Sequence, residues 1–310
     1  MDTEKLSRAE VALDVAGLTH VGRVRQRNED QYLVATLQRS LLVRDTSIKA
    51  EALRWLPAAS DGTVLLVADG MGGAEDGDVA SSVAVRAIGE YLCSLPQLAD
   101  GPSASVRLRA GTLPGVREGL ESALVEGDAE VRRAAAEADL SEEMGTTVTI
   151  AYLLWPLLYV AHAGDSRCYL YRGGLLRQLT TDHTLAQKFA EHSSLPIDED
   201  SPWHHALWNV LGGGAADALQ PEVRRVALEP EDVVLLCSDG LTKHVSDVEI
   251  GQVLAARPAA ADGCGSLVAA ANEGGGSDNV TVVIAQRRQG GRQVAPTPEG
   301  PTRIRGARGG

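Results

Sequence analysis

Residues 146–179, TTVTIAYLLWPLLYVAHAGDSRCYLYRGGLLRQL, hold four short apolar runs with little chain between them. These runs are rich in β-branched and aromatic residues, which favours strands. The last two are joined by Gly173-Gly174, a pair typical of a two-residue hairpin turn. Strands linked by such short turns pair antiparallel and not through βαβ crossovers. The strands are predicted at 146–154, 157–163, 168–172 and 175–179.

Helical patterns flank this block. Apolar residues recur at steps of three and four between Val79 and Leu92. Residues 116–138 are rich in Ala, Glu and Arg, which favours a second helix. Ser246-x-x-Glu249 is a capping box that opens a third helix, ending at about residue 256. The chain therefore predicts an α+β fold in which amphipathic helices lie on antiparallel sheet.

The composition fits one globular domain. The chain has 310 residues, of which 44% are hydrophobic but only 4% aromatic, so the core is expected to be aliphatic. No linker or repeat divides it, and we expect an N-terminal extension (1–12), one domain (13–288) and a flexible Gly-, Pro- and Arg-rich tail (289–310).

Charge and cysteine usage exclude several classes of protein. The 29 basic and 42 acidic residues give a net charge of −13, which argues against a nucleic-acid-binding surface. The most apolar stretch, 148–160, is too short to span a membrane, and no signal-peptide pattern opens the chain. The four cysteines lie far apart without CxxC spacing, as expected for reduced thiols. These features predict a cytoplasmic protein that binds neither membrane nor nucleic acid.

Three aspartates stand at the ends of apolar strands. They are Asp69 after TVLLVA (63–68), Asp239 after VVLLC and Ser238 (233–238), and Asp278, which with Asn279 precedes VTVVIA (280–285). A fourth, Asp165, lies in the turn of AHAGDSR. Ionised carboxylates near a core are costly unless compensated, and no Lys or Arg stands beside the three strand-end aspartates. One Asp-Gly pair alone indicates only a turn. Together, these carboxylates predict a site for hard cations such as Mg²⁺ or Mn²⁺.

The segment Arg25-x-x-Asn28-Glu29-Asp30 adds a positive charge. An arginine just before acidic residues is often only a surface ion pair, which contributes little. It could also bind two phosphate oxygens through its planar guanidinium group. The segment alone leaves both interpretations open.

In chain order the sequence contains RxxNED (25–30), DGMGG (69–73), GTT (145–147), GDSR (164–167), SDG (238–240) and SDN (277–279). This series resembles the metal-dependent Ser/Thr protein phosphatases of the PPM family, the type 2C class, in their short bacterial form. The resemblance implies an α-β-β-α sandwich of two antiparallel sheets flanked by helices. It also implies a monomer that hydrolyses phosphoserine and phosphothreonine in proteins by a metal-activated water, opposing bacterial Ser/Thr kinases.

The resemblance further assigns roles to residues around two Mn²⁺ or Mg²⁺ ions and a third, weaker site. Asp239 and Asp278 would bind the first ion, the Gly70 carbonyl and Glu29 would bind the second, and Asp69 would bridge both. Asp165 would bind the third ion. Asp30 would support this shell as a catalytic residue, and Arg25 would hold the substrate phosphate.

Some features depart from the family or stay open. Met71 follows Asp-Gly where eukaryotic members have a histidine, so the proton donor is unassigned, and His183 is either a substitute or an ordinary structural histidine. Residues 181–214 correspond to a mobile flap beside the active site, where His204-His205 are expected on the surface or in flap packing. The connection 36–62 is either a docking patch or a cover for the sheet. A non-hydrolytic binding module on the same fold and a small-molecule phosphatase are the alternative functions.

Overall fold

The computed structural model describes residues 13–37, 62–72, 76–95, 115–141, 143–193, 197–198, 201–213 and 218–287. The N-terminal extension, most of the 36–62 connection and the tail from 289 lie outside these residues. Within the described ranges, no helix is both long and apolar enough to cross a membrane.

The larger sheet has seven strands in the order β10-β6-β5-β3-β4-β9, and β2 pairs with β3. All of its pairings are antiparallel. Its strands are β2 (Asp30–Leu37), β3 (Gly62–Met71), β4 (Gly145–Thr146), β5 (Val148–Leu154), β6 (Leu157–Ala163), β9 (Leu211–Gly212) and β10 (Glu222–Ala227).

The smaller sheet has five strands in the order β1-β12-β11-β7-β8, also antiparallel throughout. Gly173 and Gly174, at the β7–β8 turn, both have positive φ (56° and 86°), as such a two-residue turn requires. The predicted hairpin is thus confirmed. The strands are β1 (Leu13–His20), β7 (Arg167–Arg172), β8 (Leu175–Gln178), β11 (Val233–Cys237) and β12 (Val280–Arg287).

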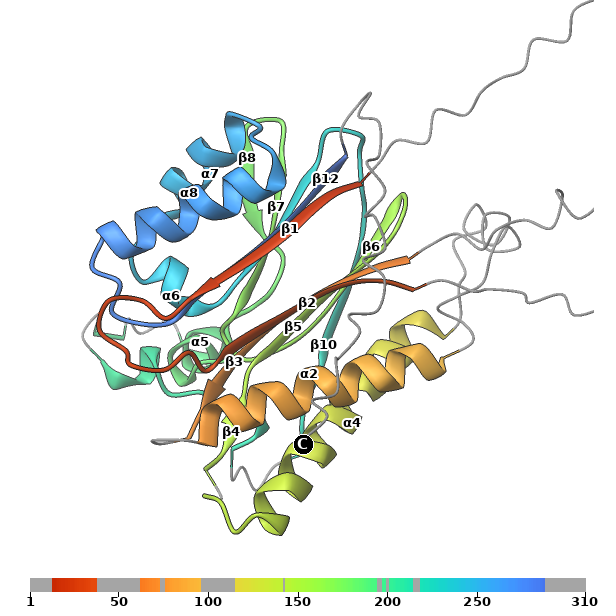
Figure 1. Ribbon diagram of the computed structural model, residues 1–310, viewed down its shortest axis with the longest axis vertical. Helices are drawn as coiled ribbons and strands as arrows, with labels where there is room; N and C mark the ends of the chain where they lie inside the picture. Colours follow the sequence, from red (N-terminus) through yellow and green to blue (C-terminus); the bar gives the residue numbers. More distant parts are fainter. Residues whose placement is uncertain are drawn as a thin grey trace, which may run out of the picture.

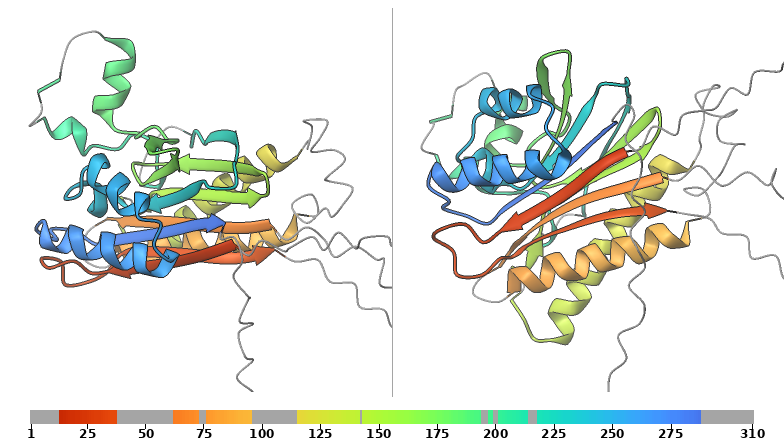
Figure 2. Two further views of the ribbon diagram at one scale, coloured as in Figure 1. Left: turned by 90° about the horizontal axis from the view of Figure 1, so that it is seen from above. Right: turned by 45° about the horizontal axis from the view of Figure 1, so that its top comes forward.

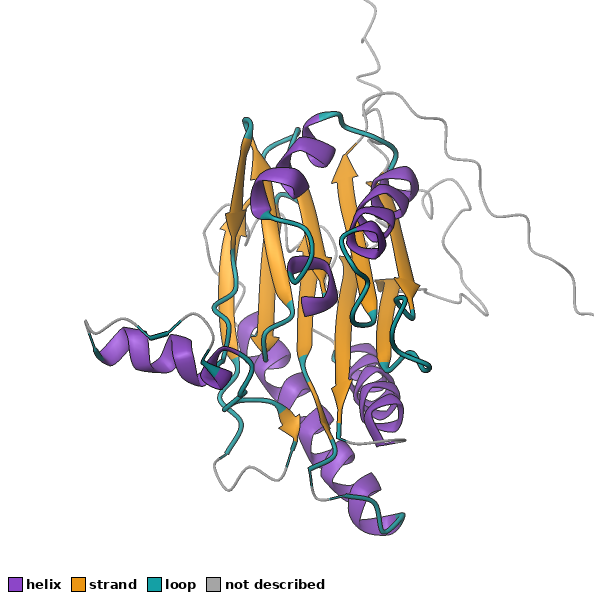
Figure 3. Ribbon diagram, turned by 90° about the vertical axis from the view of Figure 1, so that its left-hand side faces the viewer, coloured by secondary structure: helices purple, strands orange, loops and turns teal. Residues whose placement is uncertain are grey.

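Two pairs of helices cover the outer faces of the stacked sheets (Figures 1 and 3). The helices α2 (Asp76–Ser94) and α4 (Val116–Glu137) pack on the larger sheet, and α7 (Asp247–Ala255) and α8 (Ala260–Glu273) on the smaller one. Short helices follow β11 and occupy the predicted flap, where α5 projects away from the sheets (Figure 2). These are α6 (Asp239–Thr242), α5 (Leu185–His192) and the 3₁₀ turn η2 (Pro202–His204).

The core explains why the strands are apolar on both faces. Along β3, Val64, Leu66 and Ala68 pack against the α2–α4 layer, whereas Leu65 and Val67 face the other sheet. Strand β11 alternates in the same way between the α7–α8 layer and the space between the sheets. Because both faces of the central strands are buried, their sequences read as continuous apolar runs. The predicted α-β-β-α sandwich is confirmed.

The predicted elements are correct in type, with differences at their ends. The strand expected at 146–154 is interrupted at Thr147, whose side chain and backbone contact Asp69. Val79, placed on the apolar stripe of α2, is 36% exposed. Ser246 and Glu249 form the expected reciprocal capping box of α7. Among the described elements of six or more residues, five were not predicted, namely β1, β2, β10, α5 and α8.

Candidate active site

One cavity lies where the strands carrying the aspartates end. It has a volume of about 670 Å³ and is lined by all four aspartates singled out from the sequence, with Arg25, Glu29 and Gly70. Asp30 lies beneath it and is 1% exposed. The flap contributes His205 and Leu207 to its wall. The sequence analysis placed His205 on the surface or in flap packing, and it is exposed, but it also faces this cavity.

Strand pairing brings Asp30 and Asp69 together. Asp30 begins β2 directly opposite Asp69 on β3. The Asp30 Oδ2 atom accepts hydrogen bonds from the hydroxyls of Ser238 and Thr281, both at 2.7 Å. Ser238 and Thr281 belong to the smaller sheet's side of the molecule, so Asp30 ties the two sheets together beneath the cavity. The Asp69 backbone is held by Thr147, whose N–H donates to the Asp69 carbonyl at 2.9 Å.

Close backbone contact brings together the segments that carry Asp239 and Asp278. A Cβ atom on Gly240 would lie 1.9 Å from the Asn279 carbonyl oxygen, so only glycine allows this approach. The Asn279 side chain donates to the carbonyl of Arg27 at 2.8 Å and accepts from the Glu29 N–H at 2.8 Å. Asn279 therefore fixes the RxxNED loop against the Asp278 segment, a role that the sequence did not reveal.

The expectation that no basic residue lies beside the strand-end aspartates is wrong in the folded chain. The Lys243 Nζ atom lies 2.6 Å from Asp239 Oδ2 and 2.7 Å from Asp278 Oδ2. Arg25 contacts Asp278 through Nε at 2.8 Å and Nη2 at 3.1 Å. Lys243 is one helical turn after Asp239, a spacing that could have indicated this pair. Lys243 and Arg25 reach Asp278 from distant segments, so proximity along the chain did not show those contacts.

Burial and neighbouring charges shift the pKa values of the carboxylates in and beneath the cavity. Burial, supported by the charges of neighbouring carboxylates, raises the pKa of Asp30 and of Asp165 to about 7. Burial and the charges of Asp30 and Asp239 raise the pKa of Asp69 well above its usual range. Burial also acts to raise the pKa of Asp278, but the hydrogen bond and charge of Lys243, with Arg25, outweigh it and lower that pKa. Among the described residues, the cavity is thus lined by five acidic side chains and three basic ones, Arg25, Arg27 and Lys243.

These residues fit a divalent-cation centre chemically. Asp30 Oδ1 and Asp239 Oδ1 are buried carboxylate oxygens with no hydrogen-bond partner, an arrangement that is costly unless a cation approaches. The donors are oxygen atoms, which suits Mg²⁺ or Mn²⁺. In this conformation, no three His, Cys, Asp or Glu side chains of the described segments are grouped closely enough to hold one ion. Asp239 and Asp278 are instead held by Lys243.

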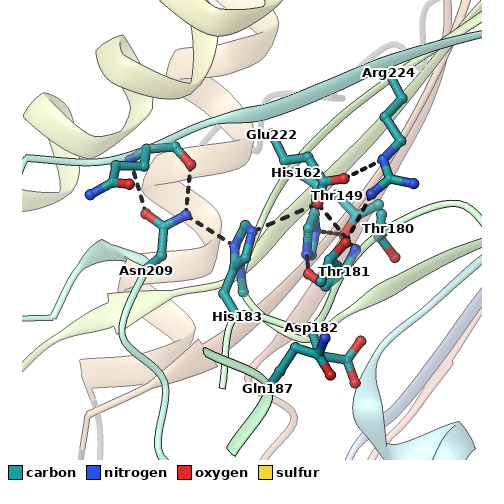
Figure 4. A network of polar contacts seen from close by, with 12 residues as sticks. Thr149, His162, Thr180, Thr181, Asp182, His183, Gln187, Asn209, Glu222 and Arg224 are labelled. Atoms are coloured by element: carbon teal, nitrogen blue, oxygen red, sulfur yellow. Dashed lines mark hydrogen bonds and ion pairs between the residues drawn. The ribbon is translucent and has the colours of Figure 1, made fainter. Parts of the chain in front are cut away.

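At the base of the flap, a polar network joins His183 to Asn209 and Glu222 (Figure 4). Hydrogen bonds to Gly164 fix His183 to the Asp165 turn. The His183 N–H donates to the Gly164 carbonyl at 2.7 Å, and the Gly164 N–H donates to His183 Nδ1 at 3.1 Å. Asn209 Nδ2 also lies 3.0 Å from that nitrogen, and the centroids of the His162 and His183 rings are 4.8 Å apart. Burial lowers the pKa of His162 and of His183 to about 4, so both are neutral near pH 7. His183 thus occupies a structural position and does not line the cavity.

Comparison with known proteins is consistent with this site. The profile of a family described as Protein phosphatase 2C matches residues 52–258. Serine/threonine phosphatase stp of Listeria monocytogenes is 32% identical over 226 residues, which cover 72% of this chain and 84% of that protein. The Mycobacterium tuberculosis serine/threonine phosphatase PstP/Ppp has a TM-score of 0.68 at 30% identity, covering 89% of this chain and 99% of that one. The catalytic domain of PstP in complex with 2 manganese ions gives a TM-score of 0.65 at 29% identity, over 88% and 97% of the two chains.

Proposed function

Because the chain belongs to the protein phosphatase 2C (PPM) family of Ser/Thr protein phosphatases, we propose that its acidic cavity is where phosphoserine and phosphothreonine in proteins are hydrolysed. The observation that carries this assignment is the convergence of Asp69, Asp165, Asp239 and Asp278 on one cavity beside Arg25. A surplus of buried negative charge with an arginine at its edge suits binding of both divalent cations and a phosphate ester.

Two Mn²⁺ or Mg²⁺ ions would be held here, as two manganese ions are in the PstP complex. Asp69 lines the cavity and would contact both ions. Asp239 and Asp278 would hold the first, and the Gly70 carbonyl with Glu29 the second. Asp165, at the flap side of the cavity, would hold a third, weaker ion. When bound, such ions supply Lewis-acid chemistry, activating water and neutralising charge on the phosphoryl group.

The protein's own residues orient the substrate and the donor atoms. Arg25 is about half exposed at the mouth of the cavity, where its guanidinium can donate hydrogen bonds to two phosphate oxygens in place of Asp278. Asp30, buried and fixed by two hydroxyls, keeps the donor set in place and would accept a proton from water in the cavity. Met71 cannot donate a proton to the leaving alkoxide, so that proton must come from another group or from solvent.

The substrates are expected to be phosphoproteins, including the targets of a bacterial Ser/Thr kinase or that kinase itself. The net charge of −13 favours basic or neutral segments around the phosphorylated residue over strongly acidic ones. The flap, with His205 and Leu207 on the cavity wall, is placed to contact the peptide. A cytoplasmic location remains a prediction from the sequence, and a monomeric state remains what the family resemblance implies.

Comparison of substrates under one set of conditions tests this proposal. Phosphate release would be measured with Mn²⁺ for a phosphothreonine peptide, a nucleotide and a sugar phosphate. We expect kcat/KM for the peptide to exceed the others by on the order of tenfold or more, equivalent to about 1.4 kcal/mol. Equal or faster turnover of the small molecules would refute protein phosphatase activity, and no turnover of any would favour a binding module.

A further inference from the structure

Lys243 occupies an unusual position for a basic side chain. Its ammonium lies between Asp239 and Asp278, at 2.6 and 2.7 Å from one oxygen of each. These are the two carboxylates proposed to share the first metal ion. A single compact cation thus bridges two proposed metal ligands that come from different segments of the chain.

Arg25, which also contacts Asp278, is arranged differently. Both Arg25 contacts are to Asp278 alone, from the mouth of the cavity. Lys243 instead comes from the end of α6 and neutralises both carboxylates at once. Its side chain is 30% exposed and lines the cavity, so its flexible stem can turn the ammonium toward solvent.

We propose that Lys243 is a built-in competitor for the metal ion, which holds Asp239 and Asp278 together when no metal is bound and must leave them when the ion binds. This inference rests on the proposed function, because it concerns the same carboxylates. It accounts for the finding that, among the described residues, no three potential ligands are grouped for one ion although five carboxylates surround the cavity.

Competition has two physical consequences. The protein without metal is stabilised, because Lys243 gives Asp239 a counterion and gives Asp278 a second one besides Arg25. Metal affinity is lowered, because binding must break two ion pairs before the carboxylates can bind the ion. A higher metal concentration is therefore needed to fill the site than if the carboxylates had no competing lysine.

Substitution Lys243→Met keeps the length of the side chain and removes its charge. Mn²⁺ binding to the full-length, EDTA-stripped protein would be measured by isothermal titration calorimetry, after circular dichroism shows that each variant is folded. We expect the variant to bind Mn²⁺ more tightly by on the order of tenfold, because the two ion pairs of Lys243 no longer oppose binding. Thermal unfolding gives a second readout. The variant should unfold at a lower temperature than the wild type without metal, and at an equal or higher one with saturating Mn²⁺.

Two variants serve as controls. Arg117→Met removes one positive charge and one pair to a residue four positions away, Glu121, on the outer helix α4. It should leave Mn²⁺ affinity unchanged. Lys243→Arg retains the charge and should bring the affinity back toward the wild-type value.

The outcomes separate this inference from the proposed function. If the wild type binds Mn²⁺ and Lys243→Met binds it equally or more weakly, Lys243 is not a competitor and the inference is overturned. If the wild type binds no Mn²⁺ and Asp239→Asn behaves identically, the metal centre itself is wrong, and with it the proposed function.

Discussion

Substitution Asp30→Asn tests the electrostatic account of the cavity most sharply. Asp30 is 1% exposed, and its pKa of about 7 compares with an ordinary value of 3.8. That difference corresponds to about 4 kcal/mol for burying the ionised carboxylate. The asparagine carbonyl can still accept from Ser238 and Thr281, which both donate to Asp30 Oδ2. Its NH₂ group would take the place of Oδ1, which has no partner, at a cost of about 1–3 kcal/mol.

The net expectation is therefore a stability gain of about 1–3 kcal/mol in the metal-free protein at pH 8. Because the folded-state pKa is raised, the penalty in the wild type is present above pH 7 and is relieved as the pH falls toward 3.8. The gain from Asp30→Asn should accordingly shrink by about 2–3 kcal/mol between pH 8 and pH 5.

Urea unfolding in EDTA at pH 8, 6.5 and 5 measures this difference directly. Asp14→Asn is the matched control, because Asp14 also accepts two hydrogen bonds, from the Ala260 N–H and Gln286 Nε2, at the opposite end of β1. The control should lose about 1 kcal/mol and show no comparable gain at pH 8. The reasoning would be refuted if Asp30→Asn were less stable than the wild type at pH 8, with the same dependence of unfolding free energy on urea concentration. Such a result would show that the hydroxyl hydrogen bonds outweigh the cost of burying the charge.

Three other predictions concern the loops and the flap. Gly240→Ala should lower the free energy of unfolding in urea by about 2–3 kcal/mol, because its Cβ would lie 1.9 Å from the Asn279 carbonyl oxygen. The control Gly265→Ala in α8 meets nothing within 4 Å and should raise that free energy by about 0.5–1 kcal/mol. Equal effects of the two substitutions would contradict the close-approach argument. Arg25→Ala should lower kcat/KM for a phosphopeptide by on the order of 10–100-fold, and unchanged steady-state kinetics would leave Arg25 as a surface ion pair. The ring resonances of His162 and His183 should not titrate by NMR between pH 7.5 and 5.5, since burial lowers both pKa values to about 4. The stability that these neutral rings confer is present above pH 6.5 and is lost as the pH falls toward 4, so a midpoint near 6.5 would disprove their burial as neutral groups.

The sandwich and the positions of the key carboxylates could be predicted because they follow from local patterns. Apolar runs buried on both faces predict central strands, and an aspartate directly after such a run must lie at a strand end, as Asp69 and Asp239 do. Edge strands such as β1 and β10 escaped prediction because they are only partly buried, so polar residues interrupt their apolar pattern.

The electrostatic partners of the site could not be predicted for a different reason. Lys243 lies beside Asp278 only because α6 follows β11 and the Asn279 segment packs on Gly240. His205 reaches the cavity only through the path of the flap. Contacts of this kind depend on how distant segments pack, and the spacing of residue types along the chain does not contain that information.

The most direct test of the account is phosphate release from a phosphothreonine peptide by the wild type with Mn²⁺, by the wild type with EDTA, and by Asp239→Asn with Mn²⁺, each shown to be folded. The account predicts release only in the first case, with the substitution lowering the rate at least about 100-fold. Comparable release by Asp239→Asn, or release that persists in EDTA, would contradict the claim that the carboxylates of this cavity carry the catalysis.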